Sequence, residues 1–409
     1  MNIALQEARA RHGAPLLVST LVFAFLLPLA QNLLPLALVA VLISWTLAPR
    51  GPRVPLQLTA HTIWSAGLYA LYLIGMAWST NMEYGLFDLQ IKLPMLLLPA
   101  LFLIRPRDLG TLVGPVGFAF VLGNAVAVLV DLLMVGVTYA QGTDLPIAQG
   151  IFSANFSVLL HPSYFAMYLE LALVFWTLLS IHRWVPSWLH WSMLAVLCLG
   201  VVLCGSKMGW ILLPLILVAV VVARWKDVRV RTPIISMIAA SVVGIVLLVS
   251  LSLYARDRVN ELWGAVTSTE AHADAQTSTE VRKLAWAGAT QVIAANLPWG
   301  AGTGDVKDEL LATYAAHGHH HLVEQRINAH DQWLQTMATL GWPGILLLLA
   351  VVLLPLFAAF VRRDLLEAVF LLLCIANWTV ESMLEVQAGV MFFAFFALLF
   401  AGTSHRLRT

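Results

Sequence analysis

The sequence predicts an all-α membrane protein with about twelve transmembrane helices and one long polar loop. Of the 409 residues, 60% are hydrophobic and only 11% are charged. A soluble domain carries roughly 25% charged residues, so this surface suits lipid better than water. One stretch, residues 254–341, interrupts the apolar segments with polar and histidine-rich sequence. The net charge of +1 gives no basic excess that would indicate nucleic-acid binding.

A membrane-spanning helix needs about 20 mostly apolar residues. Twelve segments approach this description, and they are residues 15–30, 33–48, 60–78, 86–104, 109–138, 161–181, 188–204, 209–223, 232–253, 342–361, 365–380 and 384–402. The first could pass for a signal peptide, but it is interpreted as an uncleaved span because many more follow.

Basic residues indicate which side of the membrane each loop occupies, because Lys and Arg concentrate in cytoplasmic loops. They fall at every second boundary between spans: Arg9, Arg11, Arg50, Arg53, Arg105, Arg107, Arg183, Arg224, Lys226, Arg229, Arg231, Arg362, Arg363, Arg406 and Arg408. Both termini are therefore predicted to be cytoplasmic. The chain divides into residues 1–253 with nine spans, an external loop at 254–341, and residues 342–409 with three spans.

Charged residues also occur within the predicted spans. Asp88 and Lys92 are four residues apart, so they share a helix face and can pair. Four further acids, expected near the outer membrane surface, are Asp131, Glu170, Glu381 and Glu385. Pairing between helices and a transporter's ion pathway both remain open for them, although a pathway favours acids deep in several spans.

The long loop contains a predicted helix that begins with the capping-box pattern Thr277-x-x-Glu280 and ends before Pro298. Arg282 falls in its second turn, near the positive end of the helix dipole. That position predicts either an anion site or a solvated surface arginine.

Two other features of the loop carry weaker predictions. The glycines at 300, 302 and 304 match neither a dinucleotide fingerprint nor a phosphate-binding P-loop, and they predict a turn between helices. The histidines at 317 and 319–321 predict an exposed turn more than a metal site, because no carboxylate or cysteine completes a ligand pattern. The loop lacks an Asp-x-Asp pair and the three cysteines lack CxxC spacing, so neither a metal nor another cofactor is expected.

Asn328-x-x-Asp331 predicts the start of a second helix, whose apolar face is Trp333, Leu334, Met337 and Leu340 and which Gly341 ends. His330 would lie in its first turn. A helix N-terminus disfavours the imidazolium form, so this histidine could accept a proton as a general base. A histidine packed at the membrane surface is the alternative.

Gly205-Ser206-Lys207 predicts a tight turn between two spans on the outer side. Lys207 would hold a cation at the level of the lipid phosphates, where it either binds a phosphate or extends to the surface.

Taken together, these motifs resemble the O-antigen ligase and polymerase superfamily of bacterial inner-membrane glycosyltransferases. The matching residues are Gly205-Ser206-Lys207, Arg282, Trp286, Pro298–Gly302, Asn328-Ala329-His330, Leu334, Gly341, Glu381, Glu385, Gly389 and Phe392–Phe396. They cover roughly residues 200–400. The family often has Ser-Arg where this chain has Ser206-Lys207, and lysine keeps the charge but loses the bidentate fork.

The resemblance implies a GT-C-like fold whose catalytic loop faces the periplasm. It implies a glycan donor on undecaprenyl pyrophosphate, a lipid A–core acceptor, and inversion at the anomeric carbon without a metal. His330 would be the base, and Arg282 and Lys207 would bind the pyrophosphate. Glu381 would orient the acceptor or a catalytic residue, and Ser206, Asn328 and Gly302 would also contact substrate.

Three other functions stay open. An O-antigen polymerase differs from the ligase in its acceptor. A protein O-oligosaccharyltransferase usually has further periplasmic sequence after the last span, whereas this chain ends at Thr409. A transporter of lipid-linked glycans would need no chemistry.

Overall fold

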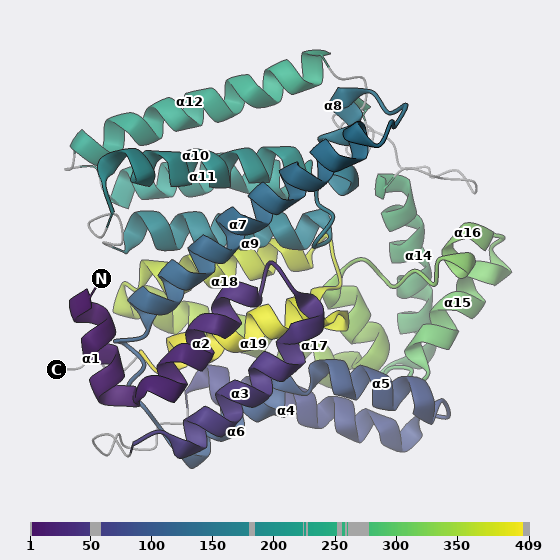
Figure 1. The fold of residues 1–409 in the computed structure, drawn as a ribbon. Helices are drawn as coiled ribbons and strands as arrows, with labels where there is room; N and C mark the ends of the chain where they lie inside the picture. The colour runs from purple at the N-terminus through teal and green to yellow at the C-terminus, as the bar shows by residue number, and fades with distance from the viewer. Residues whose placement is uncertain are drawn as a thin grey trace. The chain divides into compact units, whose positions relative to one another are not determined.

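The computed structural model describes residues 2–49, 59–179, 185–223, 225, 228–251, 256–257, 260 and 278–403. Across these residues every regular element is a helix, and Figure 1 labels the α-helices in chain order. The chain forms two compact units, one of Met1–Gly51 with Gly110–Asn260 and one of Pro52–Leu109 with Glu261–Thr409. Each unit is described by itself.

The first unit is organised around α9 (Pro162–Leu178), in which every side chain from 162 to 177 is buried. Such a helix, mostly apolar and buried on all faces, is typical of the centre of a large or membrane-embedded protein. Helices α7, α10 and α11 pack against it. The helices of this unit are α1 (Asn2–His12), α2 (Ala14–Leu26), η1 (Gln31–Leu33), α3 (Leu34–Leu47), α7 (Val113–Ala140), α8 (Ile147–Gly150), η3 (Ser153–Asn155), α9, α10 (Ser187–Cys204), α11 (Lys207–Ala223) and α12 (Val228–Leu251).

The second unit contains the longest described helix, α17 (Gln332–Arg362), with α4 and α14 packed along it. Helix α19 is almost entirely buried, and its phenylalanines surround Phe370 of α18. The helices of this unit are α4 (Ala60–Gly75), η2 (Met76–Trp78), α5 (Met82–Lys92), α6 (Pro94–Ile104), α14 (Ser278–Asn296), α15 (Val306–Ala316), α16 (His320–Glu324), α17, α18 (Leu365–Trp378), η5 (Met383–Glu385) and α19 (Gln387–Ala401).

Helices of the structure overlap all twelve predicted spans. By length and composition, three helices within the described residues can cross a membrane alone, namely α7, α10 and α17. The pair α5–α6, bent by 46°, is a fourth candidate, and the other apolar stretches found, such as Ile234–Leu247 within α12, are 10–17 residues long. The structure thus has the all-helical, apolar architecture that the composition predicts, while the number of twelve spans stays a prediction. Several residues used for the topology lie outside the described residues: Arg50, Arg53, Arg183, Arg224, Lys226, Arg406 and Arg408.

The predicted span at 86–104 is two helices rather than one. Lys92 ends α5, and Pro94 begins α6 after a bend of 46°. Proline has no N–H to donate to the preceding turn and is favoured at the first position of a new helix. The bend brings the charged end of α5 into the interior of the unit, where both Asp88 and Lys92 are buried.

Gly341 breaks α17 where the sequence predicts the end of a helix, but the chain resumes as a helix in the predicted span at 342–361. The glycine has φ 62° and ψ −148°, a conformation that other residues avoid. The break releases the carbonyl groups of Ala338 and Thr339, which accept hydrogen bonds from Ala301 at 2.8 Å and Gly302 at 2.9 Å. The helix break and the glycine-rich turn therefore satisfy each other's backbone groups.

Candidate functional site

Three polar side chains predicted from the sequence meet in the second unit. Glu381, in the turn between α18 and η5, places Oε1 2.8 Å from Nδ1 of His330 and Oε2 3.4 Å from Nη2 of Arg282. Nε of Arg282 also donates to the carbonyl of Val380 at 2.9 Å. The Glu381 side chain is 6% exposed, whereas those of Arg282 and His330 are 17% and 22% exposed. We call these three residues the Arg–Glu–His cluster.

His330 has a left-handed backbone conformation, with φ 47°. This is uncommon for a residue with a side chain and is maintained only where surrounding contacts fix it. The Asn328 side chain accepts the His330 N–H at 2.9 Å, and the indole of Trp286 donates to the His330 carbonyl at 3.4 Å. Asn328 is thus a turn residue whose side chain replaces a backbone partner, and it positions the histidine.

The prediction that His330 lies in the first turn of a helix is wrong. The helix begins at Gln332, and Asp331 is its N-cap, accepting the N–H of Leu334 at 2.8 Å. Burial raises the pKa of Asp331 to about 6, against an opposing effect of backbone hydrogen bonds from Leu334 and Trp333. His330 therefore precedes the helix. The helix N-terminus that was expected to keep the imidazole neutral therefore does not include His330, and the Glu381 carboxylate orients the ring instead.

The contact with Glu381 determines what His330 can do chemically. An ionised carboxylate can only accept hydrogen bonds, so neutral His330 must donate its Nδ1–H to Glu381. The proton acceptor of the ring is then Nε2, on the side away from Glu381. The same carboxylate stabilises the imidazolium that forms when Nε2 takes a proton. This geometry is that of an oriented general base.

Arg282 lies in the second turn of α14, as predicted, but it is not a solvated surface residue. Its bonds to Glu381 and Val380 join α14 to the segment after α18. Thr277 of the predicted capping box lies outside the described residues.

Gly302 and Ser206 have structural roles that explain their sequence. The N–H of Gly302 donates to Thr339, and a Cβ at this glycine would meet Oγ of Ser79. Ser206 accepts the N–H of Gly209 at 3.3 Å, as an N-terminal helix cap does, and α11 begins at Lys207. Ser206 and Lys207 belong to the first unit and the Arg–Glu–His cluster to the second. That these residues serve one site stays a prediction.

The predicted exposed turn is found only in part: His317 and His319 lie between α15 and α16, whereas His320 and His321 begin α16, and only His317 and His320 are exposed. Nδ1 of His317 lies 2.8 Å from the carbonyl of Thr313, and Nε2 lies 3.3 Å from the Gln291 amide. Among the residues that the structure describes, no three His, Cys, Asp or Glu side chains are grouped in a way that could hold a metal ion.

Sequence reasoning missed the contacts that align the two segments of the site. Ser382 accepts the N–H of Asp331 at 3.1 Å, and Gln332 accepts the N–H of Leu384 at 2.6 Å. Neither residue belongs to a recognisable motif. The contacts join positions about fifty residues apart, so no local pattern predicts them. The four-residue spacing of Glu381 and Glu385 was the sequence feature that could have indicated a functional role for this turn.

The described chain is apolar and all-helical, and a carboxylate orients a histidine beside an arginine. These features are typical of a membrane enzyme. Residues 192–349 match the family model described as O-antigen ligase. This match over residues 192–349 confirms the resemblance to the O-antigen ligase superfamily that the motifs within this region indicate. The family suggests a membrane enzyme of the glycosyltransferase kind, acting on lipid-linked glycans. A search of curated proteins found no match to the chain.

Proposed function

We propose that this protein is an O-antigen ligase of the bacterial inner membrane. It would transfer O-antigen polysaccharide from undecaprenyl pyrophosphate to a sugar hydroxyl of lipid A–core, at the periplasmic face. The family match supports the class of reaction. The observation that carries the proposal is the Glu381–His330 contact at 2.8 Å, because this reaction needs a base for the acceptor hydroxyl.

The proposed reaction is a single displacement at the anomeric carbon of the donor. Nε2 of His330 takes the proton of the acceptor hydroxyl while its oxygen bonds to the anomeric carbon from the face opposite the pyrophosphate. The bond between that carbon and the phosphate oxygen breaks, and its electron pair leaves with the pyrophosphate. Attack from the opposite face inverts the anomeric configuration. Glu381 stabilises the imidazolium, which afterwards releases the proton to water.

The leaving pyrophosphate gains negative charge as the bond breaks, and fixed cations near it lower the barrier. We assign Arg282 this role because it contacts the carboxylate that orients the base. A guanidinium has five N–H donors, so one arginine can bond a carboxylate and an oxyanion together.

The lipopolysaccharide of a deletion strain tests the proposal. A ligase predicts lipid A–core without attached polysaccharide, together with accumulated lipid-linked polymer. Core carrying a single repeat unit would instead identify a polymerase, the related function that differs in acceptor. A normal ladder of bands would contradict both.

Cysteine labelling tests the proposed topology, in which the segment carrying α14–α16 is periplasmic. The native cysteines Cys198, Cys204 and Cys374 are buried, which keeps the background low. Gln325→Cys, at an exposed position, should react with a membrane-impermeant maleimide in intact cells. Arg363→Cys, exposed after α17, should react only after the membrane is permeabilised. The reverse pattern would contradict the topology.

Transfer should continue in the presence of EDTA, since the proposed mechanism stabilises the leaving group with cationic side chains. The measurement is the rate of glycan transfer by purified protein before and after chelation. Loss of activity that one divalent ion restores would contradict the prediction. His317→Ala would then show whether the histidine tract holds that ion.

A further inference from the structure

We propose that Lys92 is a positioning residue for glycan transfer, acting on the Arg–Glu–His cluster through Glu385 and Gln332. The inference rests on the proposed function and extends it to residues outside the cluster. The hydrogen bonds and ring contact of Lys92 are with Asp88, Glu385 and Tyr72. Lys92 can therefore influence the reaction only through the elements that it holds in place.

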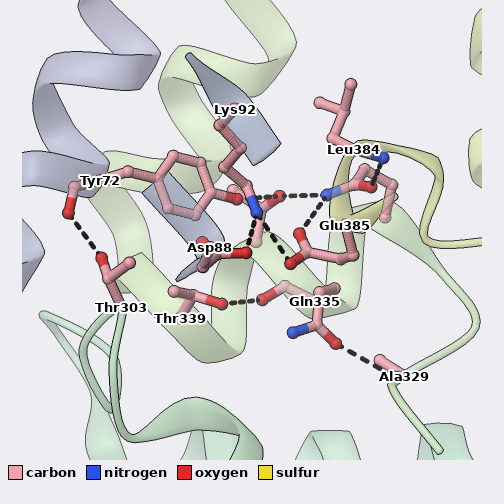
Figure 2. A network of polar contacts seen from close by, with 11 residues as sticks. Tyr72, Asp88, Lys92, Thr303, Ala329, Gln335, Thr339, Leu384 and Glu385 are labelled. Carbon is pink, nitrogen blue, oxygen red and sulfur yellow. Dashed lines mark hydrogen bonds and ion pairs between the residues drawn. The ribbon is translucent and has the colours of Figure 1, made fainter. Parts of the chain in front are cut away.

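The ammonium group of Lys92 is fully buried at the end of α5, with a side-chain exposure of 0%. Figure 2 shows it between two carboxylates, with Nζ 2.5 Å from Asp88 and 2.8 Å from Glu385. It also lies 4.6 Å from the centre of the Tyr72 ring. Burying a charge is favourable only with close partners, and removing one partner leaves the others unpaired in the interior. The position of Glu385 is therefore tightly fixed.

Glu385 passes this constraint to the start of α17. Its Oε1 accepts a hydrogen bond from Nε2 of Gln332 at 3.2 Å, and Oε1 of Gln332 accepts the N–H of Leu384 at 2.6 Å. Gln332 is fully buried and is the first residue of α17. One amide side chain thus bonds both a side chain and the backbone of η5.

The two segments joined in this way are those that carry the proposed base and its carboxylate. His330 lies two residues before Gln332, and Glu381 lies four residues before Glu385. The hydrogen bond from the Asp331 N–H to Ser382 joins the same segments at the residues directly after His330 and Glu381. Loss of the Lys92 contact should let the 381–385 segment shift relative to His330. A shift of about 1 Å in reacting groups can lower a rate roughly 10²-fold.

A double-mutant cycle distinguishes positioning from a general effect on the fold. The variants are Lys92→Met, Glu381→Ala and the double variant, assayed in lipid nanodiscs with undecaprenyl-pyrophosphate-linked O-antigen and lipid A–core. Lys92→Met should lower kcat by about 10- to 100-fold with little change in KM, because a shifted base affects the chemical step. The double variant should be no slower than Glu381→Ala alone. Normal kcat in folded Lys92→Met, or losses that multiply in the double variant, would overturn the proposal.

Gln332→Met keeps the experiment decisive if Lys92→Met does not fold. It removes the bonds to Leu384 and Glu385 but leaves the ion pairs of Lys92 intact, and it should lower kcat with the same non-additivity against Glu381→Ala. A normal kcat here would equally overturn the proposal.

Arg362→Met is the matched control. At the other end of α17, Arg362 bonds Glu367, which also contacts His61 at 3.0 Å. This variant disrupts another ion cluster, in which Glu367 is buried and Arg362 is 21% exposed, and it should lower thermal stability while kcat stays unchanged. An equal loss of kcat in Arg362→Met would overturn the specific role of Lys92.

The outcomes also separate this inference from the proposed function. If Glu381→Ala and His330→Ala keep normal kcat, the proposed function fails. If both lose activity while the Lys92 and Gln332 variants keep it, only the positioning role fails.

Discussion

Replacing His330 with alanine should leave a folded protein that binds the lipid-linked donor but transfers almost no glycan. The imidazole is the proposed acceptor of the hydroxyl proton, and loss of a positioned base costs about 10²–10⁴-fold in rate. The measurement is single-turnover transfer to lipid A–core by purified protein, with donor binding determined separately. Donor binding should be nearly unchanged, since the base acts on the acceptor.

His317→Ala is the matched control for this experiment. It removes another histidine of the same polar segment, one that lies in the exposed turn and contacts Thr313 and Gln291. Its transfer rate should equal that of the unmodified protein. Near-normal turnover in both His330→Ala and His330→Gln would instead mean that another group takes the proton, and Glu381 would be the next candidate.

Arg282→Ala should also abolish transfer, for a different reason. The guanidinium is assigned to the departing pyrophosphate, and removing one donor from a developing oxyanion costs about 10²–10³-fold in rate. Arg282→Lys should recover part of the activity, because lysine restores the charge but not the planar fork that bonds Glu381 and Val380. The decisive measurement is the rate with saturating donor, alongside the donor KM.

Two other cations serve as controls. Lys283→Ala removes the next charge along α14 and should change transfer little. Lys207→Arg should be tolerated, because arginine keeps the positive charge at this position. Full activity of Arg282→Ala with purified donor and acceptor would exclude the phosphate role.

The apolar helices could be predicted from the sequence because lipid imposes a simple rule on composition and length. The helix at 278–296 was predictable for a local reason, since apolar spacing runs on until the proline at 298. Asp88 and Lys92 pair as their four-residue spacing predicts. In each case the pattern lies within one helix and its immediate ends.

The sequence could not place His330 correctly because two residues compete for one role. Asn328 and Asp331 both accept backbone N–H groups and both suit the start of a helix. In the structure Asn328 supports the turn at His330, and Asp331 caps α17. Contacts with Glu381 and Ser382, about fifty residues away in the chain, accompany this arrangement. Such distant contacts leave no periodic pattern in the sequence.

The contacts around the break at Gly341 limit which segments can be exchanged between related proteins. A segment such as 328–341 looks transplantable, because it follows a polar turn and ends at a glycine. Yet the carbonyls just before its end bond the 301–302 turn, and its beginning bonds the turn at 381–385. A chimaera that moves this segment alone would lose the native partners of these hydrogen bonds at both of its ends. Grafts should therefore transfer residues 278–385 as one cassette, with the Lys92 end of α5 matched to its new host.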